Sequence, residues 1–192
     1  MGLDKDKIYI IENFVNQKEQ DEILENLVYK AQANVYYFTK TLYNKKYPPN
    51  IISEDQWVTI NKNKNFLLRT IENKFSVEIN EVLRVKTNWT FRKDKSHKNS
   101  MYIPHIDNSN VWVLIYYVLD SDGDTLLFDQ TTSYFPQGSI LPEDLNILSI
   151  KTSITPQKGK AVLFWGNRIH VGKPPIENDY RILINHNFTI KE

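Results

Sequence analysis

The chain has 192 residues and a mass of 22.7 kDa, a size that fits one domain. Its 24 Lys and Arg nearly balance 23 Asp and Glu, and the net charge of +1 provides no overall field for binding nucleic acid or an anionic membrane. Hydrophobic residues make up 41% of the chain, enough for a packed core, and the absence of cysteine excludes disulfides, thiolate metal sites and a cysteine nucleophile. Any metal must therefore be held by His, Asp or Glu.

The first part of the chain, to about residue 79, predicts two helices that follow a short β-branched strand at Lys7–Phe14. Asn16 and Glu19 have the spacing of a capping box and begin a helix predicted over Gln17–Ala33. A second helix is predicted over Asn63–Val77, where apolar residues recur at helical spacing. Two further segments are predicted to be extended, Val35–Tyr47 and Trp57–Ile60.

From Asn80 onward the hydrophobic period changes to two, which is typical of strands. We therefore predict a mainly β (α+β) fold: a double-stranded β-helix, or jelly-roll, core over about 80–192, buttressed by the N-terminal helices of one 1–192 domain. Two polar, turn-rich stretches, Arg92–Asn99 and Thr131–Asp144, are either lids or plain surface loops. The predicted strands are Val82–Phe91, Met101–Ile106, Val111–Leu119, Thr125–Phe128, Ile147–Ile154, Ala161–Trp165, Ile169–Val171 and Arg181–Ile190.

The sequence contains no apolar run of the roughly 18 residues that a membrane span needs, and its N-terminus is charged from the fourth residue. We therefore expect no signal peptide or membrane anchor, and a cytoplasmic protein. Nothing in the sequence indicates the oligomeric state.

His105 and Asp107 lie at the end of a predicted strand, in the segment Pro104-His105-Ile106-Asp107-Asn108. Because side chains alternate between the faces of a strand, the imidazole and the carboxylate point the same way. This pair alone is weak evidence for a metal site, since a strand-end pair can equally be solvated or hydrogen-bonded.

His170 follows a glycine turn, an apolar strand and a short bend, 63 positions after Asp107. Two histidines and one carboxylate from two strands would make a facial triad, which suits non-haem Fe(II) and leaves coordination positions open. Zinc is the less favoured alternative because it takes a tetrahedral site. On its own, a histidine beside Arg168 is more often a surface residue.

Arg181 begins the last predicted strand and shares one face with Leu183, Asn185 and Asn187. If this face lines the interior of the core, a buried guanidinium needs an anionic partner. A ligand carboxylate held by two hydrogen bonds would satisfy it. The alternative is a salt bridge to a protein acid such as Asp179 or Glu177.

The order and spacing of His105-x-Asp107, His170 and Arg181 resemble the Fe(II)/2-oxoglutarate dioxygenase superfamily, in particular its prolyl-4-hydroxylase-like branch. The resemblance covers about Val82–Phe188. It includes the strand Leu114-Ile115-Tyr116-Tyr117-Val118-Leu119 after the first ligands and the segment His170-Val171-Gly172-Lys173-Pro174-Pro175. One departure is the turn Asp122-Gly123-Asp124-Thr125, where the family often has two glycines.

The resemblance implies that His105, Asp107 and His170 bind Fe(II) and that Arg181 binds the distal carboxylate of the cosubstrate 2-oxoglutarate. Tyr117 would add a phenol hydrogen bond to that carboxylate, whereas Tyr116 points to the other face unless a one-residue bulge exchanges the two. Asn185 and Asn187, on the Arg181 face, would contact cosubstrate or substrate, or be satisfied by backbone or water.

The implied activity is an O₂-dependent hydroxylation of a C–H bond with release of succinate and CO₂. Its substrate would be a peptide, with peptidyl proline as the family's suggestion, or a small molecule. The competing hypothesis is a catalytically silent jelly-roll binding module, cupin-like or lectin-like, against which the retention of all four motif residues argues.

Overall fold

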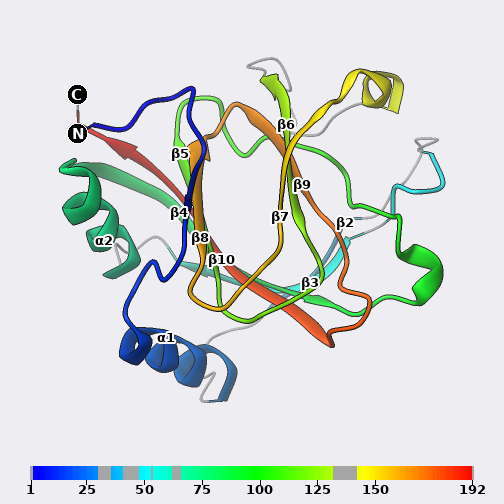
Figure 1. The fold of residues 1–192 in the computed structure, drawn as a ribbon, viewed down its shortest axis with the longest axis horizontal. Coiled ribbons are helices and arrows are strands. Elements are labelled where there is room, and N and C mark those ends of the chain that lie inside the picture. Colours follow the sequence, from blue (N-terminus) through cyan, green and yellow to red (C-terminus); the bar gives the residue numbers. More distant parts are fainter. Residues whose placement is uncertain are drawn as a thin grey trace.

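The computed structural model describes residues 2–29, 36–40, 48–52, 54–61, 66–131 and 142–191. Within them, two antiparallel sheets make a jelly roll (Figure 1). The larger sheet has seven strands in the order β1 (Tyr9–Ile11), β8 (Ala161–Trp165), β5 (Trp112–Tyr117), β10 (Tyr180–Ile190), β4 (Ile79–Phe91), β3 (Glu54–Asn61) and β2 (Tyr36–Lys40). The smaller sheet has three strands in the order β7 (Ile150–Ile154), β6 (Thr125–Thr131) and β9 (Arg168–Gly172).

The space between the sheets is filled by side chains from both of them. Alternation along β5 sends Val113, Ile115 and Tyr117 into this interior, where they pack with Phe164 of β8 and Leu127 of β6. The register of β10 against β5 pairs Leu183 with Tyr117, Asn185 with Ile115 and Asn187 with Val113. The polar face of β10 predicted from the sequence therefore faces the interior.

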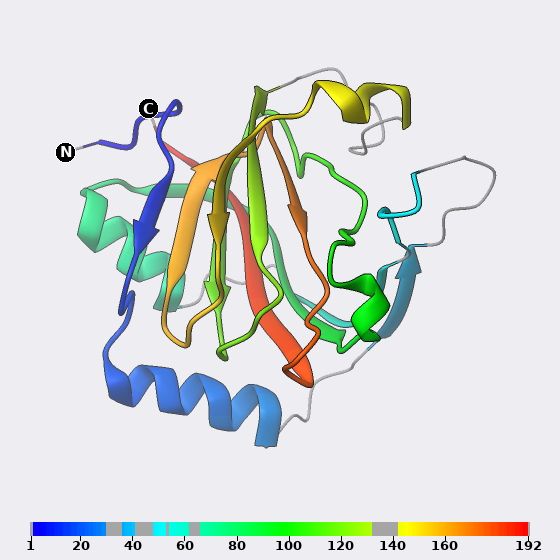
Figure 2. The same cartoon turned by 45° about the vertical axis from the view of Figure 1, so that its right-hand side comes forward.

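Helices α1 (Gln17–Leu24) and α2 (Phe66–Phe75) cover the outer face of the larger sheet (Figure 2). The predicted capping box begins α1: the Asn16 side chain accepts from the Glu19 backbone N–H at 3.0 Å, and the Asn16 N–H donates to the Glu19 carboxylate at 3.0 Å. A π-helical turn, Glu25–Tyr29, follows α1. The rest of the predicted first helix, and residues 63–65 of the second, lie outside the described residues.

Most of the predicted strands agree with the structure, but the prediction of a strand at Met101–Ile106 was wrong. This segment makes only isolated bridges, Ile51 with Met101 and His105 with His170. Pro104 has no N–H to donate, which interrupts a continuous ladder. The surviving bridge consists of reciprocal backbone bonds of 3.0 and 2.9 Å between His105 and His170, and it holds the two residues side by side.

The connections also differ from the predicted boundaries. The 3₁₀ helix η2 (Lys95–His97) lies within the polar stretch Arg92–Asn99, and a second one, η3 (Pro142–Ile147), precedes β7. The strand predicted from Ile147 therefore begins at Ile150. Residues 132–141 of the other polar stretch lie outside the described residues, so its role as a lid stays a prediction.

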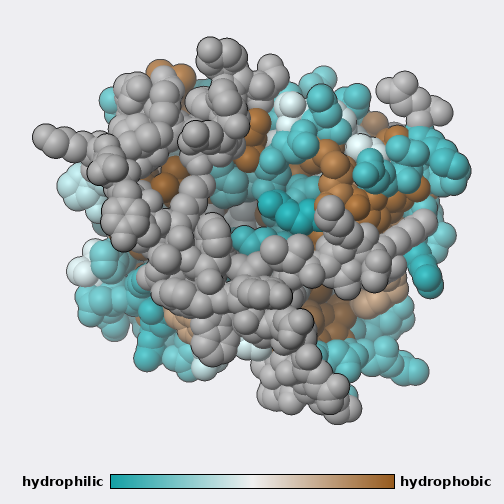
Figure 3. All heavy atoms as spheres, turned by 180° about the vertical axis from the view of Figure 1, so that it is seen from behind, coloured by the Kyte–Doolittle hydropathy of each residue, from teal (hydrophilic) through white to brown (hydrophobic). Residues whose placement is uncertain are grey.

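No helix in the described ranges is long and apolar enough to span a bilayer. The rear face of the molecule carries hydrophilic residues (teal) next to hydrophobic ones (brown) (Figure 3). The described part of this face therefore carries both hydrophilic and hydrophobic residues.

Helix α2 packs its apolar side chains against the outer face of the larger sheet. Leu68 of α2 is fully buried in the core that also contains Ile71 and Tyr116. We expect Leu68→Ala to lower the free energy of unfolding by about 2–5 kcal/mol, because it leaves a cavity. Asn73→Ala, at an exposed position of the same helix, should change it by no more than about 0.5 kcal/mol. Denaturant unfolding measures both, and equal effects would contradict this packing.

Candidate active site

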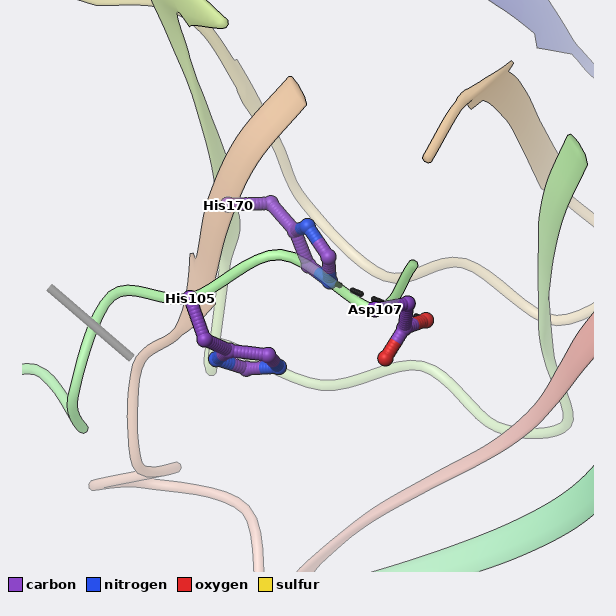
Figure 4. Close-up of side chains that lie close together, drawn as sticks. All are labelled: His105, Asp107 and His170. Carbon is purple, nitrogen blue, oxygen red and sulfur yellow. Dashed lines mark ion pairs between the residues drawn. The ribbon is translucent and has the colours of Figure 1, made fainter. Parts of the chain in front are cut away.

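His105, Asp107 and His170 converge on one point beside the interior of the jelly roll (Figure 4). His105 and Asp107 belong to the irregular segment before β5, and His170 belongs to β9. One potential ligand atom from each residue lies within 4.8 Å of the other two. His170 Nε2 is 4.0 Å from Asp107 Oδ2, and the two imidazole centroids are 4.6 Å apart. The three residues selected from the sequence are therefore brought together.

Backbone carbonyls orient both imidazoles. His105 Nδ1 lies 2.9 Å from the Ile103 carbonyl oxygen, and His170 Nδ1 lies 3.1 Å from that of Arg168. Because a carbonyl oxygen only accepts, each Nδ1 carries a proton, and in the neutral form of each ring Nε2 therefore has the free lone pair. Burial lowers the pKa of His170, which favours its neutral form. Both rings are thus oriented to ligate a metal through Nε2, since a hydrogen bond from the other ring nitrogen commonly fixes a metal-binding histidine.

Asp107 is held by three donors that come from the larger sheet. Arg84 Nη2 of β4 donates to Oδ1 at 2.7 Å, and the side-chain amides of Asn185 and Asn187 on β10 donate to Oδ2 at 2.9 and 3.0 Å. Burial alone would raise the pKa of Asp107, but the Arg84 charge and the Asn187 hydrogen bond hold it well below its usual range. The carboxylate is therefore ionised and fixed in orientation.

Arg84 is a site residue that the sequence reasoning missed. It lies 23 positions before Asp107 in the chain and opposite Asn187 in the register of β4 against β10. The strand alternation could have grouped Arg84 with the other residues of its face, but only the pairing with β10 shows that this face looks inward.

The amides of Asn185 and Asn187 were expected to contact cosubstrate or substrate. In the structure both donate to Asp107, so their observed role is to hold a candidate ligand. A contact with cosubstrate or substrate stays a prediction.

Arg181 is buried in the same interior, with 5% of its surface exposed. Its Nη2 donates to Thr125 Oγ1 at 2.6 Å. The acids considered as salt-bridge partners lie elsewhere: Asp179 pairs with Arg92 at 3.2 Å, and Glu177 pairs with Lys95 at 3.6 Å. Within the described residues Arg181 has no carboxylate partner.

Two glycines make room for the Arg181 side chain. A Cβ at Gly172 would lie 3.2 Å from Arg181 Nη1, and one at Gly123 would lie 2.9 Å from Arg181 Cδ. The absence of side chains at these residues therefore lets the strand β9 and the turn before β6 pack closely against Arg181.

Tyr117 is fully buried beside Arg181, and its hydroxyl donates to Thr125 Oγ1 at 2.7 Å. Burial raises the pKa of Tyr117 to about 12, so the phenol keeps its proton. Tyr116 faces the helices and packs against Phe14, with ring centroids 6.4 Å apart. No bulge interrupts β5, and the two tyrosines take the faces that simple alternation predicts. Thr125, which links Tyr117 to Arg181, was also missed.

The remaining two histidines lie away from this group. His97 is half-buried in η2, with Nδ1 3.3 Å from Ser100 Oγ. His186 of β10 is fully buried, and burial lowers its pKa to about 3. On β10 it alternates with Asn185 and Asn187 and therefore faces away from the interior of the jelly roll.

No protein-family model and no curated protein matches this chain, but solved structures resemble it over most of its length. The first is the non-haem α-ketoglutarate-dependent epimerase SnoN from nogalamycin biosynthesis, with a TM-score of 0.61, 9% identity and coverage of 96% of this chain and 79% of that one. The chain has the jelly-roll fold of the 2-oxoglutarate–Fe(II) oxygenases.

Two further structures agree with this assignment of the fold. An oxidoreductase of the 2OG-Fe(II) oxygenase family from Burkholderia pseudomallei gives a TM-score of 0.59 at 13% identity, covering 95% of this chain and 84% of that one. A prolyl hydroxylase from Trichoplax adhaerens, in complex with a hypoxia-inducible-factor peptide fragment, gives a TM-score of 0.59 at 16% identity. The match covers 94% of this chain and 82% of that one.

Proposed function

We propose that this protein is an Fe(II)- and 2-oxoglutarate-dependent oxygenase that hydroxylates a C–H bond and releases succinate and CO₂. The observation that carries the proposal is the convergence of His105, Asp107 and His170 within 4.8 Å. The fold shared with 2-oxoglutarate–Fe(II) oxygenases supports it.

The donor set fits a non-haem iron site. Two imidazoles with unprotonated Nε2 atoms and one ionised carboxylate give the 2-His-1-carboxylate set, which suits Fe(II) and leaves positions open for other ligands. When bound there, the iron would supply the oxygen chemistry, whereas the protein groups hold and orient the reactants. Arg84, Asn185 and Asn187 would keep the Asp107 carboxylate in place.

The buried surroundings of Arg181 fit the distal carboxylate of 2-oxoglutarate. A buried guanidinium with no protein carboxylate partner in the described part of the chain favours a ligand anion. Its planar donors suit two parallel hydrogen bonds to a carboxylate. The protonated Tyr117 hydroxyl and the Thr125 hydroxyl lie beside it as further hydrogen-bonding groups.

The finer assignment, to a peptidyl prolyl hydroxylase, rests on the motif resemblance and on the peptide-bound Trichoplax hydroxylase among the structural neighbours. Succinate formation from 2-oxoglutarate under Fe(II) and O₂ tests the oxygenase. Stimulation by proline-rich peptides rather than by free amino acids tests the peptide substrate. A protein that binds neither Fe(II) nor 2-oxoglutarate and forms no succinate would instead be the silent jelly-roll binding module.

Tyr117→Phe provides a smaller, local test of the cosubstrate pocket. We expect the affinity of the metal-loaded protein for 2-oxoglutarate to fall by about 2- to 12-fold, because one hydrogen bond is lost. Tyr116→Phe is the matched control and should leave this affinity unchanged, since that ring lies in the helix-facing core. Calorimetric titration measures both, and equal effects of the two variants would contradict the assigned role of Tyr117.

A further inference from the structure

Arg84 contacts the candidate metal ligand Asp107 and is itself partly exposed to solvent. Its guanidinium lies 2.7 Å from Asp107 Oδ1, yet 36% of its side chain is exposed, compared with 6% for Asp107. Arg181, the other arginine of the interior, is buried. A molecule that approaches the centre from solvent can therefore contact Arg84, whereas Arg181 lies deeper in the core.

The charges of the proposed complex leave one positive charge in excess. Within the described residues the centre has two guanidinium groups, Arg84 and Arg181, and one carboxylate, Asp107. A divalent metal and the dianion 2-oxoglutarate cancel each other, so the sum remains +1. The Arg181 charge would be matched by the distal carboxylate, and Asp107 would be shared between the metal and Arg84. The unmatched charge therefore lies at Arg84.

We propose that Arg84 binds an anionic group of the substrate, a carboxylate or a phosphate, beside the carbon that is oxidised. This inference rests on the proposed oxygenase function. An arginine whose side chain is partly exposed and lies close to a metal cation is stabilised by a further anion, and its planar donors suit both kinds of anionic group.

A first experiment tests the anion site without requiring a particular substrate shape. Protein loaded with Mn(II) and 2-oxoglutarate is treated with the arginine reagent phenylglyoxal, and modification of Arg84 is followed by mass spectrometry. Acetate or inorganic phosphate should slow this modification several-fold, whereas neutral acetamide should not. The acetate and phosphate arms distinguish the two anions. Equal rates with both anions and acetamide would overturn the proposal.

A second experiment uses the matched probes N-acetylproline and N-acetylprolinamide in the succinate assay. The wild type should show a KM at least about 10-fold lower for the acid, the scale of a charge-assisted contact. In Arg84→Gln this ratio should fall to near one, and Arg84→Lys should restore part of it. A ratio that persists in Arg84→Gln, or is absent in the wild type, contradicts the proposal. If neither probe stimulates succinate formation, the modification experiment decides.

The alternative role for Arg84 is only to position Asp107. In that case Arg84→Gln would weaken Mn(II) binding and slow turnover with both probes equally, leaving their KM ratio unchanged. Wild-type protein that consumes 2-oxoglutarate but does not discriminate charge overturns only the inference about Arg84. Wild-type protein with no metal-dependent binding or turnover of 2-oxoglutarate overturns the oxygenase itself.

Discussion

Asp107→Ala should lower the affinity for Mn(II), used as a stable substitute for Fe(II), by about 100-fold or more. Loss of a group that hydrogen-bonds to a metal ligand typically costs 10- to 100-fold in metal affinity. This substitution removes a proposed ligand itself, the only carboxylate among the three converging residues. Calorimetric titration of the metal-free protein measures the effect.

Two further variants make the Asp107 result decisive. Asp107→Asn keeps the side-chain shape but removes the charge, so it should also bind Mn(II) weakly while retaining the wild-type melting temperature more closely. Asp129→Ala is the control, because Asp129 is an exposed acid of β6 that pairs with Lys151. Unchanged Mn(II) affinity in both Asp107 variants would show that the metal is held elsewhere.

Arg181→Gln should weaken 2-oxoglutarate binding by about 10- to 150-fold while leaving Mn(II) binding nearly intact. This range corresponds to a charge-assisted contact worth about 1.5–3 kcal/mol. Arg92→Gln removes an arginine from an exposed ion pair and should change neither affinity. Calorimetric titration of Mn(II) into the metal-free variants, and of 2-oxoglutarate into the Mn(II)-loaded variants, measures the two affinities.

The opposite result for Arg181 would have a clear structural meaning. If Arg181→Gln unfolds the protein while the folded fraction binds 2-oxoglutarate normally, its guanidinium serves the packing among Gly123, Thr125 and Gly172. The assignment of Arg181 as the cosubstrate anchor would then be wrong.

Alternation along single strands was sufficient to predict much of this site. It placed Arg181, Asn185 and Asn187 on one face of β10, and it separated Tyr117 from Tyr116, as the structure has them. The prediction worked because these strands are regular and their apolar faces are buried, which fixes the register.

What the sequence did not provide depends on contacts between strands. The pairing of Arg84 with Asp107 requires the register of β4 against β10 and the packing of an irregular segment over both. The segment Met101–Ile106 has the composition of a strand, but Pro104 removes a donor, and only single bridges form. Thr125 was overlooked because its hydroxyl becomes important only where β6 meets Tyr117 and Arg181.

The most direct test of the site is a crystal structure with Mn(II) and 2-oxoglutarate, in which anomalous scattering locates the metal. We expect one strong peak within bonding distance of Nε2 of His105, Nε2 of His170 and a carboxylate oxygen of Asp107, and a 2-oxoglutarate whose distal carboxylate contacts Arg181. A metal peak away from these three residues, or a 2-oxoglutarate bound without contact to Arg181, would contradict it.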